Sequence, residues 1–413
     1  MGRGKHIGGR KRSPLLFGIT FRAILIVAAA AMFLSYISVY VNPSKFALPL
    51  FFGLYFIPIL AINLFLLMLA LLRRSASAWI TVAALLPALL YTDLFFKIGH
   101  NEKVGTEGIR LKIESWNVGM FSSSEEGLGR EECRHRIAAH LAETAPDIIC
   151  MQEFFAEDKL QADTIFSSWP HRHYHLFKAR NGKLFGNVIL SKFPISGSGR
   201  ISFPNSTNLS IFADVEHYGR TLRIYNNHLE SYDVSFTALA HKFAGRMRSS
   251  SLNLREGSLG TDRYSGRQKT ADNPAVQKAS AMEEPTGKIH RETLREEITH
   301  DIVETHGKMK NTFIKRSQQV DRILEDINRS STPAIICGDF NDTPMSYTYH
   351  TLAKNRKDTF EEAGRGFGGT FIPVWPLLRI DYILAPSDAG CSEHNILREP
   401  LSDHYPITAT VVL

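Results

Sequence analysis

Three long apolar segments near the N-terminus constrain this chain more than any other feature of its sequence. They run from about Ile24 to Val41, from about Ala47 to Leu72 and from about Ala78 to Phe96. A helix needs roughly 20 apolar residues to cross about 30 Å of hydrocarbon, and each segment approaches or exceeds that length. The sequence therefore predicts three transmembrane helices within residues 1–104.

The positive charges around these segments predict their orientation. A basic stretch, residues 1–12, precedes the first segment, and Arg73 and Arg74 follow the second. Lys and Arg in short flanking segments remain cytoplasmic, so everything after about Lys97 is expected outside the cytoplasmic membrane. If the first segment is instead a cleaved signal peptide, two helices and the same outward-facing domain remain. We expect a multi-pass protein of the cytoplasmic (inner) membrane with an extracytoplasmic catalytic domain.

Residues 105–413 have the pattern of one globular domain. Short runs rich in β-branched and aliphatic residues alternate with helical and turn-rich stretches, which favours an α/β (α+β) fold of two packed sheets flanked by helices. Eight runs predict strands: Leu111–Val118, Asp147–Phe154, Gly186–Phe193, Leu209–His217, Thr221–Glu230, Pro333–Phe340, Arg379–Pro386 and Pro406–Leu413.

Between the first two runs, the stretch EECRHRIAAHLAETAP has apolar residues at helical spacing and predicts a helix. The stretch at about 232–300 is rich in Ser, Gly, Lys and Arg with little periodicity, and predicts a flexible insertion. A helix is expected after it, from about Ile302 to Asn328. Cys150 and Cys337 fall within predicted strands, and a bridge between them depends on whether those strands are neighbours.

Polar residues recur at the ends of the predicted strands. A single carboxylate in such a position is usually a turn or cap residue. Several together are costly to bury unless they satisfy one another or a cation. These residues are Asn117, Glu153, Asn227, His228, Asp339, Asn341, Asp381, Asp403 and His404.

This set of residue types suits hydrolysis at phosphorus. Oxygen ligands such as Glu153 and Asn117, with Asp381 or Asp403, favour Mg²⁺, which keeps positions for water and phosphate. Zinc fits less well because Cys ligands are absent and oxygens dominate. Histidines beside carboxylates suit proton transfer or stabilisation of a developing charge. Metal, histidine and acid together describe metal-assisted hydrolysis of a phosphate ester.

The motifs WN, QE, NNHLES, GDFND, RIDYIL and SDHYPI, in this order, resemble the endonuclease/exonuclease/phosphatase superfamily, which is deoxyribonuclease-I-like. The resemblance covers about Gly108 to Leu413, interrupted by the insertion. It implies a four-layer α/β/β/α sandwich with the site at one edge of the two sheets. It also implies a divalent metal cofactor, Mg²⁺ with Mn²⁺ as an alternative.

The resemblance further implies roles for single residues. Glu153 matches the principal metal ligand, Asn117 its companion and Asp403 a second acid near the metal. Asp339 matches the acid that orients or deprotonates the attacking water, and Asn341 matches a residue that holds a phosphate oxygen.

The histidines take roles from the same resemblance. His404 matches the catalytic histidine, with Asp381 as its carboxylate partner. His228 matches a phosphate-contacting histidine, and Asn227 beside it is expected to bind substrate. The general base stays open; Asp339 or His404 is favoured over His228.

The sequence thus predicts a membrane-anchored, divalent-metal-dependent phosphodiester hydrolase of nuclease-like type. The alternative within the same fold is a phosphodiesterase or phosphatase that acts on a lipid head group, so the expected partners are nucleic acid or phospholipid and the bilayer. No protein partner is evident. A third alternative, a catalytically inert binding scaffold, is weakened because every motif position carries the residue that the superfamily uses.

Overall fold

The computed structural model of this protein describes residues 14–99, 108–123, 127–204, 206–232 and 285–413. The chain divides into two compact units, one of residues 1–230 and 313–413 and the other of residues 231–312. The long helix α9 (Pro285–Arg329) contributes residues to each. Most of the predicted insertion lies outside the described residues. Its last part, residues 285–300, belongs to α9, so the helix begins earlier than expected, and the flexibility of the insertion stays a prediction.

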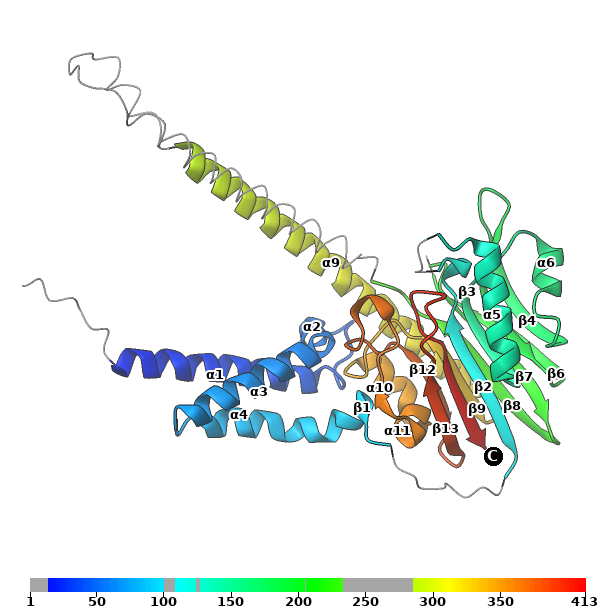
Figure 1. Cartoon of the computed structure of the whole chain (residues 1–413), viewed down its shortest axis with the longest axis horizontal. Helices are drawn as coiled ribbons and strands as arrows, with labels where there is room; N and C mark the ends of the chain where they lie inside the picture. Colours follow the sequence, from blue (N-terminus) through cyan, green and yellow to red (C-terminus); the bar gives the residue numbers. More distant parts are fainter. Residues whose placement is uncertain (1–13, 100–107, 124–126, 205, 233–284) are drawn as a thin grey trace, which may run out of the picture. The chain divides into compact units, whose positions relative to one another are not determined.

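Two mixed six-stranded sheets form the larger unit (Figure 1). The first contains, in spatial order, β10 (Arg356–Asp358), β12 (Asp381–Pro386), β9 (Ala334–Asp339), β8 (Arg220–His228), β7 (Leu209–His217) and β6 (Ile195–Ser202). The second contains β13 (Gly390–Ile396), β14 (Ile407–Val412), β2 (Arg110–Asn117), β3 (Ile148–Ala156), β5 (Leu184–Ser191) and β4 (His171–Lys178). All eight predicted strands are present.

The core lies between the two sheets, and helices cover their outer faces. Ile113, Ile148, Ile211 and Ile335 are among the buried residues that the two sheets share. The predicted helix is α5 (Arg130–Thr144), and its buried face packs against β3 and β5. On the other sheet, residues 320–327 of α9 pack with α10 (Tyr347–Ala353) over β8, β9 and β12. The expected α/β fold of two packed sheets is confirmed.

Short elements complete the unit. They are β1 (Phe96–Lys97), which pairs with β11 (Gly366–Phe367), and the helices η2 (Gly119–Phe121), α6 (Lys159–Thr164), α11 (Thr359–Ala363) and η3 (Ile372–Val374). All four cysteines are buried and unpaired. Cys150 and Cys337 lie close to each other. Burial, together with the hydrogen bond between the two thiols, raises the pKa of Cys150.

The N-terminal segment forms α1 (Pro14–Ile37), α2 (Leu48–Leu54), α3 (Phe56–Leu72), α4 (Ala78–Leu85) and η1 (Leu86–Leu94). Of these described helices, only α1 is both long and apolar enough to span a membrane alone. The second expected span is bent by 73° between α2 and α3, and counts only if the bent pair is one span. The third is shorter and continues as a 3₁₀ helix from Leu86, because Pro87 lacks the N–H that an α-helical bond needs. The prediction of three uninterrupted transmembrane helices is therefore wrong.

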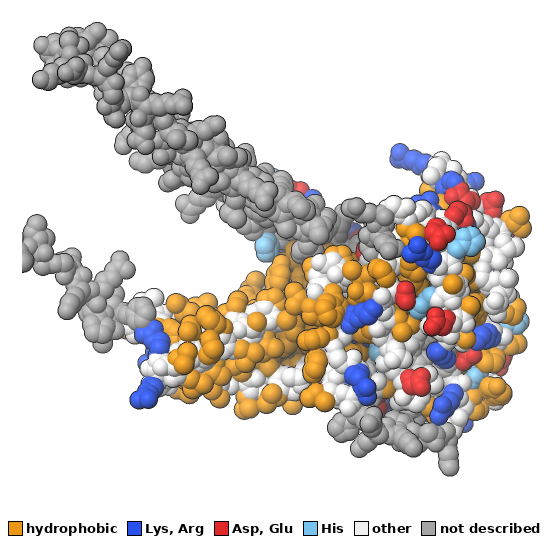
Figure 2. All heavy atoms as spheres, viewed as in Figure 1, with side chains coloured by type: hydrophobic (Ala, Val, Ile, Leu, Met, Phe, Trp, Pro, Cys, Tyr) orange, Lys and Arg blue, Asp and Glu red, His pale blue; other side chains and the backbone are white. Residues whose placement is uncertain are grey.

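These helices expose apolar side chains (Figure 2) and also pack on the two-sheet domain. Ser38 Oγ donates to the carbonyl of Met345 (2.7 Å), and Asn42 Nδ2 donates to the hydroxyl of Tyr347 (3.1 Å). Met345 is buried in the same apolar cluster as α1 and α3. The N-terminal helices therefore belong to the same compact unit as the sheets.

Candidate active site

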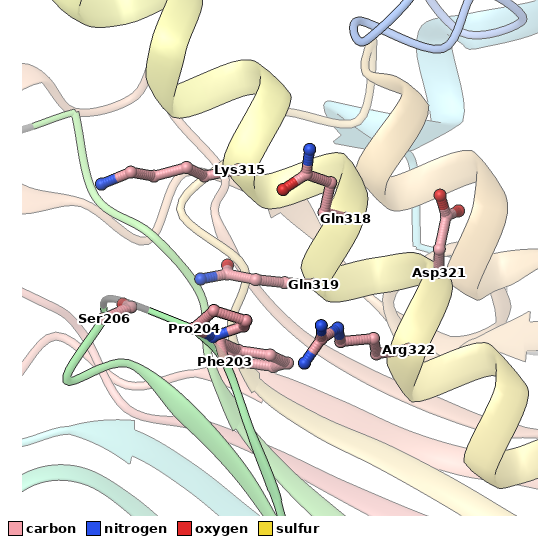
Figure 3. A pocket seen from close by; sticks show the side chains of 8 residues that line it. All are labelled: Phe203, Pro204, Ser206, Lys315, Gln318, Gln319, Asp321 and Arg322. Carbon is pink, nitrogen blue, oxygen red and sulfur yellow. The ribbon is translucent and has the colours of Figure 1, made fainter.

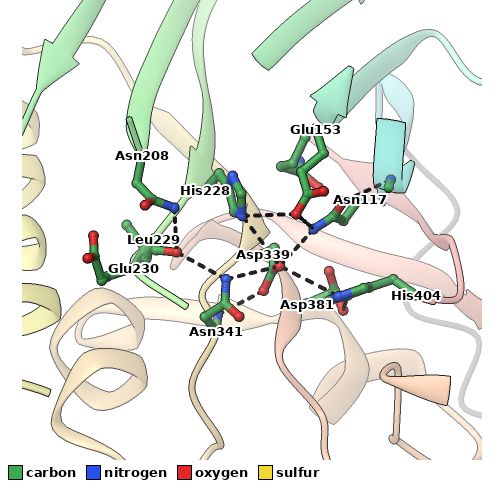
Figure 4. A network of polar contacts seen from close by, with 12 residues as sticks. Asn117, Glu153, Asn208, His228, Leu229, Glu230, Asp339, Asn341, Asp381 and His404 are labelled. Carbon is green, nitrogen blue, oxygen red and sulfur yellow. Dashed lines mark hydrogen bonds and ion pairs between the residues drawn. The ribbon is translucent and has the colours of Figure 1, made fainter. Parts of the chain in front are cut away.

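Most of the polar residues predicted from strand ends meet at one edge of the two sheets (Figure 4). Asn117 ends β2 and Glu153 lies in β3, both in the second sheet. In the first sheet, Asp339 ends β9 and is the direct cross-strand partner of His228 on β8 and of Asp381 on β12. The register of the strands therefore fixes Asp339 between His228 and Asp381.

Asn117 connects the two sheets at this edge. Its Nδ2 donates to Asp339 Oδ2 (3.0 Å) and to Glu153 Oε1 (3.2 Å), while its Oδ1 accepts from the Gly119 N–H (3.1 Å). Asn117 and Asp339 are buried, but the Glu153 side chain is 34% exposed. The partly exposed Glu153 carboxylate thus lies beside the buried Asp339 carboxylate, and the Asn117 amide bonds to both.

Two site residues have left-handed backbone conformations, which cost non-glycine residues of order 1–3 kcal/mol and gather at functional sites. Glu153 has φ 50° at a bulge where the pairing of β3 with β5 shifts between Met151 and Phe154. Asn341 has φ 52° just after β9 ends. The bulge and the turn redirect both side chains toward the sheet edge.

A buried ion pair, Asp381 with His404, forms the other side of the site. His404 Nδ1 lies 2.9 Å from Asp381 Oδ2, and Nε2 lies 3.8 Å from Asp339 Oδ2. Burial lowers the His404 pKa, but the charges of Asp381 and Asp339 and the Asp381 hydrogen bond outweigh it and raise the pKa to about 10. Burial raises the pKa of Asp339 to about 6, although His404 opposes this shift.

Asn341 orients Asp339. Its backbone N–H donates to Asp339 Oδ1 (2.8 Å), and its Nδ2 donates to Asp339 Oδ2 (3.2 Å) and to the carbonyl of Leu229 (3.0 Å). Asn208 Nδ2 donates to the same carbonyl (2.9 Å). The left-handed backbone of Asn341 thus turns its side chain toward Asp339.

His228 lies above the carboxylates. Its Nε2 is 3.6 Å from Glu153 Oε1 and 4.0 Å from Asp339 Oδ2, and has no hydrogen-bond partner among the described residues. His228 is therefore placed to contact a group that approaches both acids.

Three residues near the sheet edge do not join the group of facing side chains: Asn227, Asp342 and Asp403. Asn227 is fully buried and donates to the Cys337 carbonyl (2.8 Å), because neighbouring residues of a strand face opposite ways. It holds β8 to β9, a position that does not support the expected contact with substrate. Asp342 is buried in an ion pair with Arg316 (2.9 Å). Asp403 is exposed at the rim, with its Oδ1 3.2 Å from Ser402 Oγ, and its role as a metal ligand stays a prediction.

A polar layer between the sheets was missed by sequence reasoning. Gln152 Nε2 donates to Asn226 Oδ1 (2.7 Å), and Asn226 Nδ2 donates to the carbonyls of Met151 and Val188. Asn187 Nδ2 adds a bond to the Leu209 carbonyl (3.2 Å). The alternation of β8 was the available signal, since it places Asn226 on the same face as His228.

A cavity of about 290 Å³ lies between α9 and the segment 203–206 (Figure 3). It contains none of the predicted site residues, and Lys315 Nζ on its wall already binds Glu230 Oε1 (2.7 Å). Its lining residues are Phe203, Pro204, Ser206, Lys315, Gln318, Gln319, Asp321 and Arg322.

The donors at the sheet edge fit a small hard cation. Asp339, Asp381 and His404 each offer an atom within 4.8 Å of the others, but a protonated His404 cannot ligate a cation. The oxygens left to hold one are those of the acids and of Asn117, whose amide bonds to both Glu153 and Asp339. Among the described residues, Asp381 Oδ1 is buried without a hydrogen-bond partner. Carboxylate and amide oxygens in this arrangement are typical of Mg²⁺ sites, and a cation offsets the charge of the gathered acids.

Comparison with known families places a match over this site. The model described as "Endonuclease/Exonuclease/phosphatase family" matches residues 115–404, a range that includes every site residue named above. A model of a domain of unknown function matches residues 18–93, which cover most of the N-terminal helices. No curated protein matches the chain.

Several solved structures are similar to this chain at low identity. An endonuclease/exonuclease/phosphatase from Beutenbergia cavernae has a TM-score of 0.46 and 16% identity, over 74% of this chain and 72% of that one. The human Nocturnin catalytic domain has a TM-score of 0.45 and 15% identity, over 73% and 94%. A mannosyl-6-phosphatase from Bacteroides thetaiotaomicron has a TM-score of 0.43 and 15% identity, over 73% and 100%.

Proposed function

Because the chain belongs to the endonuclease/exonuclease/phosphatase family, a group of phosphoric ester hydrolases, we propose that it is a divalent-metal-dependent phosphodiester hydrolase. One observation carries the proposal. Residues far apart in the sequence and from both sheets gather at a single edge, where buried acids, a buried imidazolium and a half-exposed carboxylate lie within a few ångströms of one another.

We assign the cation, Mg²⁺ or Mn²⁺, to Glu153 and Asn117, with Asp403 near it. Asn117 turns its nitrogen toward Glu153, so binding through its oxygen requires the amide to turn over and release the Gly119 N–H. A bound cation supplies positive charge to a phosphate oxygen. His228 and Asn341 contact other oxygens of the same phosphate.

The protonation states suggest the roles of Asp339 and His404. With its pKa near 6, Asp339 is mostly ionised at neutral pH and accepts the proton of the attacking water, as a base matched to working pH should. The water oxygen bonds to phosphorus as the ester P–O bond breaks. His404, an imidazolium held by Asp381, donates its Nε2 proton to the leaving oxygen.

The N-terminal helices support membrane association with the site outside the cytoplasm. Arg73, which follows α3, lies over the ring of Phe21 in α1 (4.7 Å), at the end of these two helices that lies away from the sheets (Figure 1). The opposite end contacts the two-sheet domain through Ser38 and Asn42. Lys and Arg stay on the cytoplasmic side, which puts the sheets and the site on the other side.

The experiment is hydrolysis of bis-p-nitrophenyl phosphate by the full chain in detergent, with and without Mg²⁺. We expect metal-dependent release of nitrophenol and a loss of about 10²–10⁴-fold in His404→Ala, the range for removal of a positioned acid or base. His135→Ala, on the exposed face of α5, is the matched control and should be unchanged. Equal rates in His404→Ala and the parent would contradict the assignment.

A further inference from the structure

An apolar cavity of about 300 Å³ lies where the N-terminal helices meet the two-sheet domain. Its walls come from α3, η1, β1 and the segment 366–378, so both matched families contribute to it. None of its lining residues is charged. They are Phe56, Ile57, Leu60, Ala88, Thr92, Phe95, Phe96, Phe367, Pro376 and Leu377.

The segment 366–378 connects this cavity to the site. Phe367 and Leu377 line the cavity, while Phe371 forms a backbone bridge with His404 and places its ring 5.2 Å from the imidazole. Thr370 Oγ1 accepts from the Asp381 N–H (3.3 Å). Four residues span at most about 14 Å, so the wall at Phe367 lies within that distance of Phe371, which touches the proposed acid.

The mouth of the cavity resembles a membrane-contacting surface. Phe96, Phe367, Trp375 and Leu377 are each more than 40% exposed. The Arg398 guanidinium lies 4.7 Å from the rings of both Trp375 and Tyr405. Trp, Tyr and Arg with exposed apolar neighbours are typical of a protein surface at the membrane–water interface.

We propose that the cavity holds an aliphatic chain of a membrane lipid whose phosphodiester is cleaved at the sheet edge. This inference rests on the proposed hydrolase function and deepens it by choosing a lipid over a nucleic acid. A volume of 300 Å³ equals about ten waters of roughly 30 Å³ each, which accommodates a chain of about ten carbons. A nucleic acid requires cations along its path, and the cavity lining offers none.

The reaction needs no additional reactant. Water adds to phosphorus and one P–O ester bond breaks, so the lipid phosphodiester gives a phosphate monoester and an alcohol. The chain in the cavity stays attached to one of these products, and its burial positions the phosphate beside His404.

The test uses n-alkyl phosphates of two to twelve carbons as competitive inhibitors of bis-p-nitrophenyl phosphate hydrolysis by the full chain. Each buried methylene contributes at most about a fourfold gain in affinity. We expect the inhibition constant to fall two- to fourfold for each added methylene up to about ten carbons, and then to level off.

Two matched variants separate the cavity from general partitioning into detergent. Leu377→Asp places a charge at the exposed mouth, and Leu160→Asp makes the same change at an exposed leucine of α6. Leu160 lies outside both the site and the cavity, so Leu160→Asp should hydrolyse bis-p-nitrophenyl phosphate at the parent rate. Leu377 lines the cavity, so inhibition of Leu377→Asp is measured relative to the uninhibited rate of that variant. In Leu160→Asp, the inhibition constant should fall with chain length as it does in the parent. In Leu377→Asp, the inhibition constant of decyl phosphate should be at least tenfold higher than in the parent.

A readout without catalysis distinguishes failure of the cavity from failure of the hydrolase. A decyl phosphate that carries a photoreactive group at the end of its chain should label peptides containing residues 88–97 and 366–378. Hydrolysis without labelling there overturns the cavity assignment alone, as does a chain-length dependence that Leu377→Asp leaves intact. Labelling without any hydrolysis overturns the hydrolase instead. Single-stranded DNA cleaved faster than lipid vesicles overturns the choice of substrate class.

Discussion

At the scale of single residues, the site depends on buried charge that the fold arranges in opposing pairs. Asp339 is held by three donors from Asn117 and Asn341, and its nearest positive charge is His404. Just beyond it, Arg316 and Asp342 form a second buried pair. Removal of one partner from such a pair typically costs 3–5 kcal/mol because the other charge stays buried. The turn after β9 is therefore held at Asp339, before Asn341, and at Asp342, after it.

His350 on α10 makes the stability of the chain depend on pH. Burial lowers its pKa to about 4, from about 6.5 in the unfolded chain. His350 thus takes up a proton less readily in the folded state than in the unfolded chain. The contribution of neutral His350 to the free energy of unfolding is therefore full above about pH 6.5 and is lost as the pH falls. Between pH 7 and pH 5 this loss is about 2 kcal/mol.

We expect His350→Gln to lose less stability than the parent when full-chain thermal unfolding is compared at pH 7 and pH 5. His135→Gln, at an exposed position of α5, should behave as the parent does. A fall in melting temperature that is the same in His350→Gln and in the parent would rule out this role for His350.

At the scale of elements, the strands that could be predicted from the sequence are those with a paired neighbour on each side. All eight predicted strands lie inside the two sheets, and β9 is buried at every position. The longer strands that went unpredicted, β4, β6 and β13, are all edge strands. Edge strands carry polar residues and glycine, as in ISGSGRIS of β6, because one side of the strand faces solvent. These edge strands therefore cannot be recognised from composition alone.

The site was predictable to the same extent. Strand-end polar residues gather because parallel β2 and β3, and parallel β8 and β9, end at the same edge. The bulge that turns Glu153 and the partner of Asp342 were not readable, since both depend on contacts with distant segments. The buried position of Asn227 follows from alternation with His228, because neighbouring residues of a strand face opposite ways.

Gly338 sets the close approach of β8 and β9 beneath the site. Its φ is +130°, and an added Cβ would lie 2.0 Å from the Asn227 carbonyl oxygen. We expect Gly338→Ala to destabilise the chain by about 2 kcal/mol or more, through both the clash and the strained backbone. Because Asp339 follows directly, hydrolysis should fall as well.

Gly129→Ala is the control, because its Cβ meets nothing within 4 Å and its backbone at the start of α5 is extended. Thermal unfolding and hydrolysis of bis-p-nitrophenyl phosphate are the two measurements. A Gly338→Ala chain as stable and as active as Gly129→Ala would show that β8 and β9 can separate without effect.

At the scale of the whole molecule, the N-terminal helices and the sheets share packed surfaces. Gly53 of α2 lies so close to the Met345 carbonyl that a Cβ would come within 2.2 Å of it, and Leu94 of η1 is buried with Tyr349 and Tyr382. The sequence suggested a separate anchor with a boundary near residue 104. These contacts instead make the N-terminal helices and the sheets one compact unit.

The central claim is that remote segments of this chain hold one hard cation at the sheet edge. The most direct measurement is Mn²⁺ binding to the full chain by electron paramagnetic resonance, repeated with Glu153→Gln and with Glu132→Gln on the exposed face of α5. We predict stoichiometric binding that weakens at least tenfold in Glu153→Gln and is unchanged in Glu132→Gln. Binding that is equal in all three proteins, or absent from the parent, would contradict the claim.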